Sequence, residues 1–498
     1  MSSKSKDDDR QVLLRSRRDF IRQVACAGVG SLALTSSIRD MRLINSVLAQ
    51  AGGLTGYKAL VCLFLAGGND CNNLLVPRGA EYTSYQAARQ NLAIPELSLN
   101  PISPINNDGH SYGFHPNCSE LANLFGEGKL AVLFNVGPLL YPTTRDQYQK
   151  KLVAMPPQLF SHSDQVTHWQ TSIPDQPAKT GWGGRIADIL HSQQPGADIS
   201  LTTSLAGANT FEVGNSVAQY HVSTSGAVTL LKGSTTPLDT WRVNAMQNII
   251  NQSKGITHPN QQDRAYAEVM DRAIATGQVL NSAIAPTVDT GGTPPWTWAT
   301  PFPNTTLGNQ LKMVARVIAA RNALGMKRQI FFCSVGGYDT HTAQVGDNAH
   351  PGDPLYGAHA SLMNELSEGV YAFQRGIEQV AGSAALGADP SLVQGVTAFT
   401  ASDFGRTFPT NGQGSDHGWG GHHLMIGGAV QGRRTYGTFP VLQINGPNDT
   451  STGRWIPTTS VDEYSATLAK WFGVAASDMN TVFPNLGRFA VPDLGFMA

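Results

Sequence analysis

The residues with the clearest potential for chemistry lie in one short stretch near the C-terminus. Positions 414–423 read GSDHGWGGHH, so three of the 13 histidines in this 498-residue chain fall between positions 417 and 423. The stretch supplies Asp416, His417, His422 and His423, and its glycines allow the backbone to turn tightly around a centre. Carboxylate and imidazole ligands without thiolates suit Zn²⁺, Mn²⁺ or iron. We therefore interpret the stretch as a metal-binding loop.

A second group of candidate ligands follows apolar runs elsewhere in the chain. Asp70, Asp339 and Asp403 each stand just after such a run. The motif GGYDTH also places His341 two residues beyond Asp339, where both side chains can point to the same side of an extended turn. A single aspartate after a strand is usually a helix cap or a turn residue. Three of them, two in a Gly-Gly-x-Asp setting, favour a shared site.

The elements that must position these residues follow from the hydrophobic pattern. Short apolar runs predict buried strands, and apolar residues at helical spacing predict helices. The predicted strands are 57–66, 129–136, 329–335 and 395–400, and the predicted helices are 118–125, 307–324 and 359–380. Helices that alternate with apolar strands indicate an α/β fold, with a mainly parallel sheet and helices on both faces. Ligands bind at the carboxyl ends of the strands in such sheets, so we expect Asp70, Asp339 and Asp403 to converge at one edge.

The number of candidate ligands predicts more than one ion. The aspartates and histidines named above are too many for one tetrahedral ion. Two ions about 3.5–4 Å apart would use them, and paired ions commonly catalyse displacement at phosphate and similar esters.

The middle of the chain has a weaker pattern. The stretch from about 186 to 305 is rich in Thr, Ser, Asn and Pro, and it contains one convincing helix near 261–284. We expect this stretch to be an insertion or cap within a single domain that spans residues 52–498.

The N-terminus predicts export. SRRDFIR at 16–22 is a twin-arginine signature, and the apolar stretch after it is too short and too rich in Gly, Ala and Ser for a stable membrane span. Ala49 and Ala51 supply the small residues that a signal peptidase reads. We therefore expect residues 1–51 to be a signal peptide that directs the protein through the twin-arginine export machinery to the periplasm or the medium. This route carries folded proteins, often with a metal already in place.

The charge balance excludes one class of partner. The formal net charge is −1 and 14% of the residues are charged. Nucleic-acid binders carry a basic face, so the sequence gives no case for binding nucleic acid.

Several motifs together resemble a known family. The chain pairs GGND with GGYDTH, and it carries SDFGRT followed by DHGWGGHH. In these motifs residues 57–498 resemble an uncharacterised, twin-arginine-exported bacterial family within the alkaline phosphatase and sulfatase superfamily. The resemblance implies a doubly wound core and a hydrolase of phosphate or sulfate esters, acting on a small-molecule or polymer substrate. It also implies two divalent metal ions (Zn, Mn, Mg, Ca or Fe), with Asp70 as a ligand from the first strand and Asp339 and His341 as ligands of one ion.

One position departs from the superfamily pattern. Phe404 stands where a histidine is expected directly after the strand-end aspartate. Either Asp403 keeps the strand-end role and His417 loops back to replace that imidazole, or Asp416 and His417 form the pair and Asp403 orients the loop. The sequence leaves both arrangements open.

The resemblance also suggests a nucleophile and an oxyanion ligand. The superfamily places the nucleophile at a helix start after the second strand, and the matching stretch LFSHSDQ offers Ser161 first and Ser163 second. Ser161 and Asp164 also fit a helix-capping pattern. Arg406 could bind a tetrahedral oxyanion, or it could pair with a neighbouring carboxylate.

Two hypotheses follow from the sequence. The first is an exported, metal-dependent hydrolase of phosphate or sulfate esters, of which a reaction without a covalent intermediate is a variant. The alternative is a non-catalytic exported protein that retains the fold as a binding or assembly scaffold.

Overall fold

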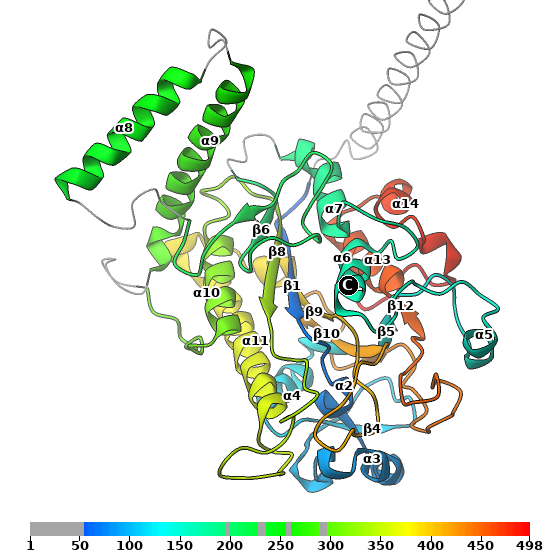
Figure 1. The fold of residues 1–498 in the computed structure, drawn as a ribbon. Helices are drawn as coiled ribbons and strands as arrows, with labels where there is room; N and C mark the ends of the chain where they lie inside the picture. Colours follow the sequence, from blue (N-terminus) through cyan, green and yellow to red (C-terminus); the bar gives the residue numbers. More distant parts are fainter. Residues whose placement is uncertain (1–53, 195–198, 228–235, 255–259, 289–295) are drawn as a thin grey trace, which may run out of the picture. The chain divides into compact units, whose positions relative to one another are not determined.

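A nine-stranded, mostly parallel sheet forms the centre of the described chain (Figure 1). At its middle, β1 (Lys58–Leu65) pairs in parallel with β8 (Arg328–Val335) and with β9 (Val396–Ser402). The next strand, β10 (Gly421–Gly427), lies between β9 and β5 (Leu130–Gly137) and runs antiparallel to both. The strand order is β11-β5-β10-β9-β1-β8-β6-β7, and β12 also pairs with β5.

The computed structural model describes part of the chain and includes several shorter strands. The described residues are 54–194, 199–227, 236–254, 260–288 and 296–498, so the predicted signal segment lies outside them. The short strands of the main sheet are β6 (Thr202–Ser204), β7 (Tyr220–His221), β11 (Thr435–Tyr436) and β12 (Thr459–Ser460). A second, small sheet contains β2 (Leu75–Arg78), β3 (Asn100–Ile102) and β4 (Ser111–Phe114).

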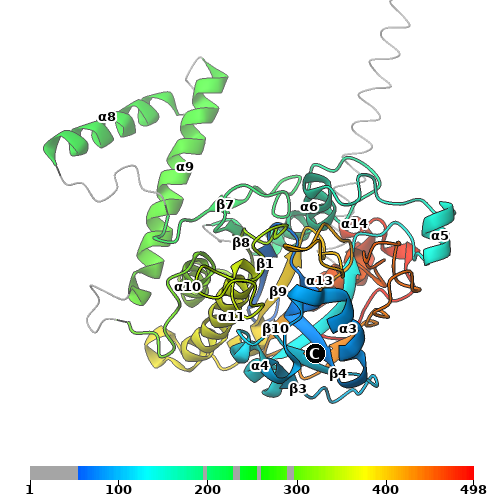
Figure 2. The same ribbon diagram turned by 60° about the horizontal axis from the view of Figure 1, so that its bottom comes forward.

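Both faces of the main sheet are buried. Alternate side chains of a strand point to opposite faces, and along β1 they enter two different hydrophobic clusters, with Val61 and Leu63 in one and Leu60 and Phe64 in the other. This burial on both sides explains why the KALVCLFL run is almost continuously apolar. The first cluster includes residues of α4 (Ser119–Gly126), α10 (Thr306–Ala319) and α11 (Ala358–Gly382), and the second includes residues of α7 (Trp182–Leu190), α13 (Val461–Phe472) and α14 (Met479–Val482). Figure 2 shows α4, α10, α11, α13 and α14 as ribbons around the central strands.

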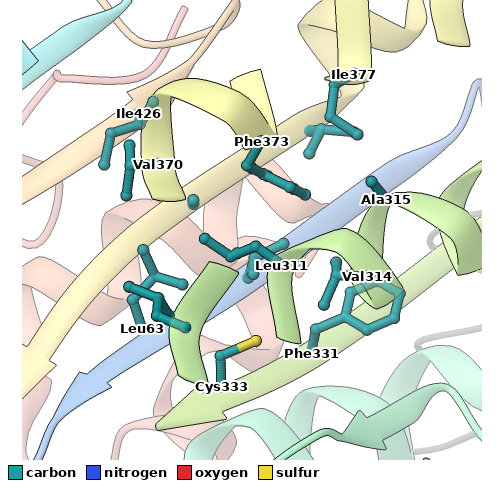
Figure 3. Packing of buried hydrophobic residues seen from close by; sticks show 14 of the residues in the cluster. Leu63, Leu311, Val314, Ala315, Phe331, Cys333, Val370, Phe373, Ile377 and Ile426 are labelled. Carbon is teal, nitrogen blue, oxygen red and sulfur yellow. The ribbon is translucent and has the colours of Figure 1, made fainter. Parts of the chain in front are cut away.

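Two long helices cover the middle strands. The α10 sequence TLGNQLKMVARVIA starts after a threonine cap and repeats apolar residues at helical spacing. Figure 3 shows Leu311 and Val314 of α10 and Phe373 of α11 packed close to Leu63 and Cys333 of the sheet. Large-to-small changes in such a core typically cost about 2–5 kcal/mol of stability, so this packing fixes the strands whose ends carry the site.

The structure confirms the predicted α/β class with a mostly parallel central sheet. The four predicted strands are present as β1, β5, β8 and β9, and the three predicted helices as α4, α10 and α11. The interpretation of 414–423 as one loop is wrong in its last part, because GHHLMIG forms the buried strand β10. His422 and His423 therefore lie on a strand inside the sheet.

The predicted insertion at about 186–305 contributes to the sheet as well as carrying helices. Its strands β6 and β7 extend the main sheet beyond β8. Helix α9 (Gln261–Ile284) matches the predicted helix, and α8 (Pro237–Ser253), which was not predicted, packs against it (Figure 1). The remaining helices are α2 (Cys71–Leu74), α3 (Tyr82–Arg89), α5 (Arg145–Lys150), α6 (His162–Thr171) and α12 (Leu392–Gly395). Within the described ranges, no helix is long and apolar enough to cross a bilayer.

Candidate metal centre

Three imidazoles and one carboxylate converge where the central strands end. Asp339 and His341 lie in the turn after β8, His417 lies in the loop between β9 and β10, and His162 is the first residue of α6. The Nε2 atom of His417 is 3.0 Å from that of His162 and 2.9 Å from that of His341. The same atom is 3.3 Å from Oδ1 of Asp339. We call these four residues the histidine cluster.

The other ring nitrogen of His417 faces a backbone carbonyl. Its Nδ1 lies 2.8 Å from the carbonyl oxygen of Phe160. A carbonyl can only accept a hydrogen bond, so Nδ1 carries the proton and, in the neutral ring, Nε2 presents a lone pair. Metal-ligating histidines in proteins typically show this arrangement, because the outer acceptor fixes the tautomer and the ring orientation.

The other two histidines repeat the arrangement with carboxylates. Nδ1 of His162 lies 2.7 Å from Oδ2 of Asp403, and Nδ1 of His341 lies 3.0 Å from Oδ1 of Asp416. A hydrogen bond from Asn411, together with His341, holds the pKa of Asp416 below its usual value, so this carboxylate is ionised and accepts. In a neutral ring whose Nδ1 donates to such an acceptor, Nε2 carries the lone pair that a metal ligand needs.

The donor set of the histidine cluster fits a divalent cation. With the ring proton on Nδ1, neutral Nε2 atoms at 2.9 and 3.0 Å do not hydrogen-bond to one another. The ligand atoms of His162, Asp339 and His417 lie within 4.8 Å of one another, so a cation among these three would satisfy their lone pairs at once. Two imidazoles and one carboxylate are a typical set of protein ligands for catalytic Zn²⁺, and imidazole ligands also suit iron. The cluster is thus a candidate metal centre.

The protonation states of the cluster also suit a metal ligand set. Partial burial raises the pKa of Asp339, but the hydrogen bond and charge of Arg406 and the neighbouring histidines outweigh this and hold it below its usual value. Nη1 of Arg406 donates to Oδ1 of Asp339 at 2.6 Å. Burial lowers the pKa of His417, so its ring is neutral at neutral pH. Metal binding requires such a deprotonated imidazole and an ionised carboxylate.

The turn after β1 holds in place the Asp403 carboxylate, which is the acceptor for Nδ1 of His162. Gly67 has a φ of +116°, which L-residues rarely adopt, and a Cβ at this position would collide with the backbone of Asp339. Its N–H donates to Oδ1 of Asp403 at 3.0 Å, while Oδ2 of Asp403 faces His162. The Gly-Gly sequence therefore positions Asp403, and through it His162.

The structure bears on both arrangements that the sequence left open around Phe404. The ring of Phe404 packs 4.6 Å from that of His417 and 4.8 Å from that of His162, so it forms a wall of the cluster. His417 does loop back into the cluster. Asp403 and Asp416 do not face the Nε2 atoms of the cluster. Asp403 lies on the Nδ1 side of His162, and Asp416 lies on the Nδ1 side of His341.

Asp70 is placed differently from its expected role as a metal ligand. Its carboxylate is fully buried and forms an ion pair with Arg89 of α3. It also accepts hydrogen bonds from Gln344 and from Asn72. Because a buried guanidinium already compensates its charge, the expectation of a ligand role for Asp70 does not match this placement.

His422 and His423 also lie outside the cluster, contrary to the expectation that they bind metal. As neighbours on β10 they point to opposite faces. Nδ1 of His422 accepts from the backbone N–H of Asn135, and Nδ1 of His423 lies 3.2 Å from the hydroxyl of Thr400. Burial lowers the pKa of both rings to about 3. They are neutral core residues of the sheet.

The two candidate nucleophiles flank a residue of the histidine cluster that was not predicted from the sequence. Ser161 directs its hydroxyl to Oδ2 of Asp164 at 2.6 Å, and Ser163 lies 3.3 Å from the same oxygen. Among the described residues, no hydrogen bond joins either serine to the histidine cluster. The residue between them, His162, belongs to the cluster, and its place in the LFSHSDQ stretch was the available signal. For Arg406, the structure shows the pairing with a carboxylate, Asp339.

Comparisons with known proteins place the chain in a family. No curated protein matches it. One similar solved structure is the crystal structure of PsFucS1 sulfatase from Pseudoalteromonas sp., which is 10% identical, covers 88% of this chain and 72% of its own, and gives a TM-score of 0.30. A family model described as "Protein of unknown function (DUF1501)" matches residues 57–452, which is most of the chain. The chain therefore belongs to the DUF1501 family.

Proposed function

We propose that this protein is an exported, metal-dependent hydrolase of phosphate or sulfate esters, with its metal centre at the histidine cluster. The observation that supports it most strongly is the convergence of three Nε2 atoms and the Asp339 carboxylate, with every Nδ1 atom held by an acceptor. The ester class and the twin-arginine route to the periplasm rest on the sequence motifs.

The geometry favours one ion at this cluster instead of the two expected from the sequence. The ligand atoms of His162, Asp339 and His417 lie within 4.8 Å of one another, and three protein ligands with one open position suffice for a catalytic ion. A second site on the expected plan would draw on Asp70, His422 and His423, whose partners are Arg89 and core residues. The imidazole-rich set favours Zn²⁺ or iron over Mg²⁺ and Ca²⁺, which prefer oxygen ligands.

The cluster is open enough to admit a substrate. The side chains of His417 and Asp339 are 23% and 45% exposed. A bound divalent cation would supply Lewis acidity toward an ester oxygen. The chain itself keeps Asp339 ionised through Arg406, and it fixes the three imidazoles through their Nδ1 partners.

The serine geometry supports hydrolysis by water without a covalent intermediate. Both hydroxyls are directed at Asp164. In the proposed reaction a water oxygen bonds to phosphorus or sulfur as the ester bond breaks. One water proton goes to the leaving oxygen, which departs as the alcohol. The inorganic anion keeps the water oxygen, and the second proton stays on that anion or passes to solvent.

The test is hydrolysis of p-nitrophenyl phosphate and p-nitrophenyl sulfate by the protein loaded with Zn²⁺ or Fe²⁺. We expect turnover of at least one ester, its loss with a chelator and on His162→Ala, and its retention in His110→Ala, whose ring pairs with Glu81 away from the cluster. A metal-loaded protein that turns over neither ester would contradict the hydrolase proposal and favour the non-catalytic scaffold.

A further inference from the structure

Arg454 lies beside the histidine cluster with part of its hydrogen-bonding capacity unused. Its Nε donates to the backbone carbonyl of His417 at 2.8 Å, and its guanidinium carbon lies 4.3 Å from the centre of the Phe160 ring. The side chain is half-buried. Within the described part of the chain, neither of its Nη atoms donates to a protein acceptor. The guanidinium plane is thus anchored at one edge and open at the other.

Phe160 ties this guanidinium to the cluster. Its carbonyl accepts from Nδ1 of His417, while its ring supports Arg454. Its φ of +74° is in the left-handed region, which an aromatic residue rarely occupies and which persists where the surroundings enforce it. One constrained residue therefore sets the positions of both His417 and Arg454.

The other arginines near the cluster are already committed. Arg406 is fully buried, and its Nη atoms donate to Asp339, to the Gly67 carbonyl and to the Ser415 carbonyl. Arg89 donates to Asp70 and to two backbone carbonyls. Arg454 is thus the guanidinium of these three that retains open Nη donors for a ligand.

The local charge balance favours an anionic ligand once a cation is bound. The carboxylates of Asp339, Asp403 and Asp416 outnumber the guanidiniums of Arg406 and Arg454 by one formal charge. A divalent cation would turn this small negative excess into a positive one. A site with that balance attracts anions and repels cations.

We infer that Arg454 binds the anionic group of the substrate through its two Nη atoms, and that this group is a phosphate or sulfate monoester. The inference rests on the proposed function. A guanidinium fork takes two oxygens of a tetrahedral anion side by side. A monoester has three terminal oxygens, enough for the fork and the cation together, whereas a phosphodiester has only two.

The test measures binding of inorganic phosphate and inorganic sulfate by calorimetry, on metal-free and metal-loaded protein. We expect Arg454→Met to weaken binding of the preferred anion about 10- to 100-fold, because a charge-assisted pair of hydrogen bonds is lost. Its metal content should not change. Arg454→Lys keeps the charge without the fork and should lose less affinity. Arg488→Met is the matched control, because Arg488 also stacks on an aromatic ring but pairs with Asp175.

The outcomes separate this inference from the proposed function. Anion affinity in Arg454→Met equal to that of the wild type, or no binding of either anion by the metal-loaded wild type, would overturn the role of Arg454 even if the esters are hydrolysed. Arg454-dependent anion binding without any hydrolysis would support the anion site and count against the hydrolase. Thermal melting checks that each variant folds, and Arg454→Lys decides the question if Arg454→Met does not.

Discussion

Asp70 and Asp339 follow neighbouring parallel strands in nearly the same sequence, GGND and GGYD, yet their surroundings are opposite. Strands β1 and β8 align with Leu65 opposite Val335, so the two turns leave the sheet side by side. Asp70 is fully buried against Arg89, whereas the Asp339 side chain is 45% exposed and faces three imidazoles. The same local sequence has produced a structural ion pair at one strand end and a candidate ligand at the next.

The difference lies in access and not in charge. Both carboxyls have a lowered pKa, because burial, which raises it, is outweighed by a nearby guanidinium. Asp70 uses its oxygens on Arg89, Gln344 and Asn72 inside the protein. Asp339 gives Oδ1 to Arg406 and keeps Oδ2 on the cluster side, 3.4 Å from Nε2 of His162. A carboxylate can bind a metal ion only when some of its oxygen lone pairs are not already used by donors within the protein.

The largest expected effect on stability comes from Asp70→Asn. It leaves the Arg89 guanidinium buried without a counter-charge, which should lower the free energy of unfolding by about 3–5 kcal/mol. Urea unfolding measures this change. Asp175→Asn removes the charge of a carboxylate that pairs with Arg488 and is more exposed than Asp70. This change should cost less than about 1 kcal/mol. Loss of metal affinity in Asp70→Asn with stability retained would show that Asp70 is a ligand after all.

His417→Ala should have the largest effect on metal binding. At a structural zinc site four ligands share a binding free energy of roughly 10–16 kcal/mol, or about 2.5–4 kcal/mol each, so losing one ligand should weaken affinity about 100- to 1,000-fold. Competition with a chromophoric zinc chelator measures it. His423→Ala, six residues away on β10, should keep the wild-type metal affinity and lose stability instead. Equal losses of metal affinity in the two variants would contradict the assignment of His417 to the metal centre and of His423 to the core.

Asp403→Asn should have an intermediate effect. His162 would lose the carboxylate that orients its Nδ1, and such changes behind a ligand typically cost about 10- to 100-fold in metal affinity. Asp416→Asn should cost less, because the Asp416 side chain is 50% exposed and water can replace it. The same chelator competition ranks the two variants. The reverse ranking would mean that Asp416, not Asp403, supports the main ligand.

The core histidines should make the fold sensitive to acid. The pKa values of His422 and His423 are about 3 in the folded protein and about 6.5 when unfolded. Between these values the unfolded chain binds protons that the native chain does not, so stability should fall as the pH drops below about 6.5. By pH 5 each could cost up to about 2 kcal/mol. Urea unfolding at pH 7.5, 6 and 5 checks this, and a pH-independent free energy would contradict it.

The smallest effect is expected from Ser161→Ala and Ser163→Ala. Their hydroxyls hydrogen-bond to Asp164, so kcat of the metal-loaded protein should change by only a few-fold. Removal of a true nucleophile typically costs several orders of magnitude. A loss of that size in either variant would replace water with that serine in the proposed reaction.

The strands were predictable because burial on both faces leaves a sequence signature. β1 reads as an almost continuous apolar run, and β8 and β9 contain shorter apolar stretches between a few polar residues. The rule for strand ends predicted that Asp339, His341 and His417 come together. β10 was missed because GHHLMIG begins with glycine and two histidines. Only the contacts with Asn135 and Thr400 on the adjacent strands make those imidazoles acceptable in a core.

The remaining differences between the expected and the observed placement of site residues have a common physical cause. Arg89 lies 19 residues after Asp70 on a separate helix, and nothing local to either residue announces that they pair. His162 lies between two serines at a helix start. It joins the cluster because it contacts Asp403 and His417, which follow β9 more than 200 residues later in the chain. Local spacing predicts which residues can reach a strand end, whereas the choice of partner is made by tertiary packing.

Metal content per chain tests the central claim most directly. The measurement is mass spectrometry of the ions retained after loading and desalting, on the wild type, Asp339→Asn and Asp70→Asn. The account predicts one divalent ion per chain in the wild type and in folded Asp70→Asn, and loss of that ion in Asp339→Asn. A folded wild type without stoichiometric metal, or an ion that Asp339→Asn keeps and Asp70→Asn loses, would contradict it.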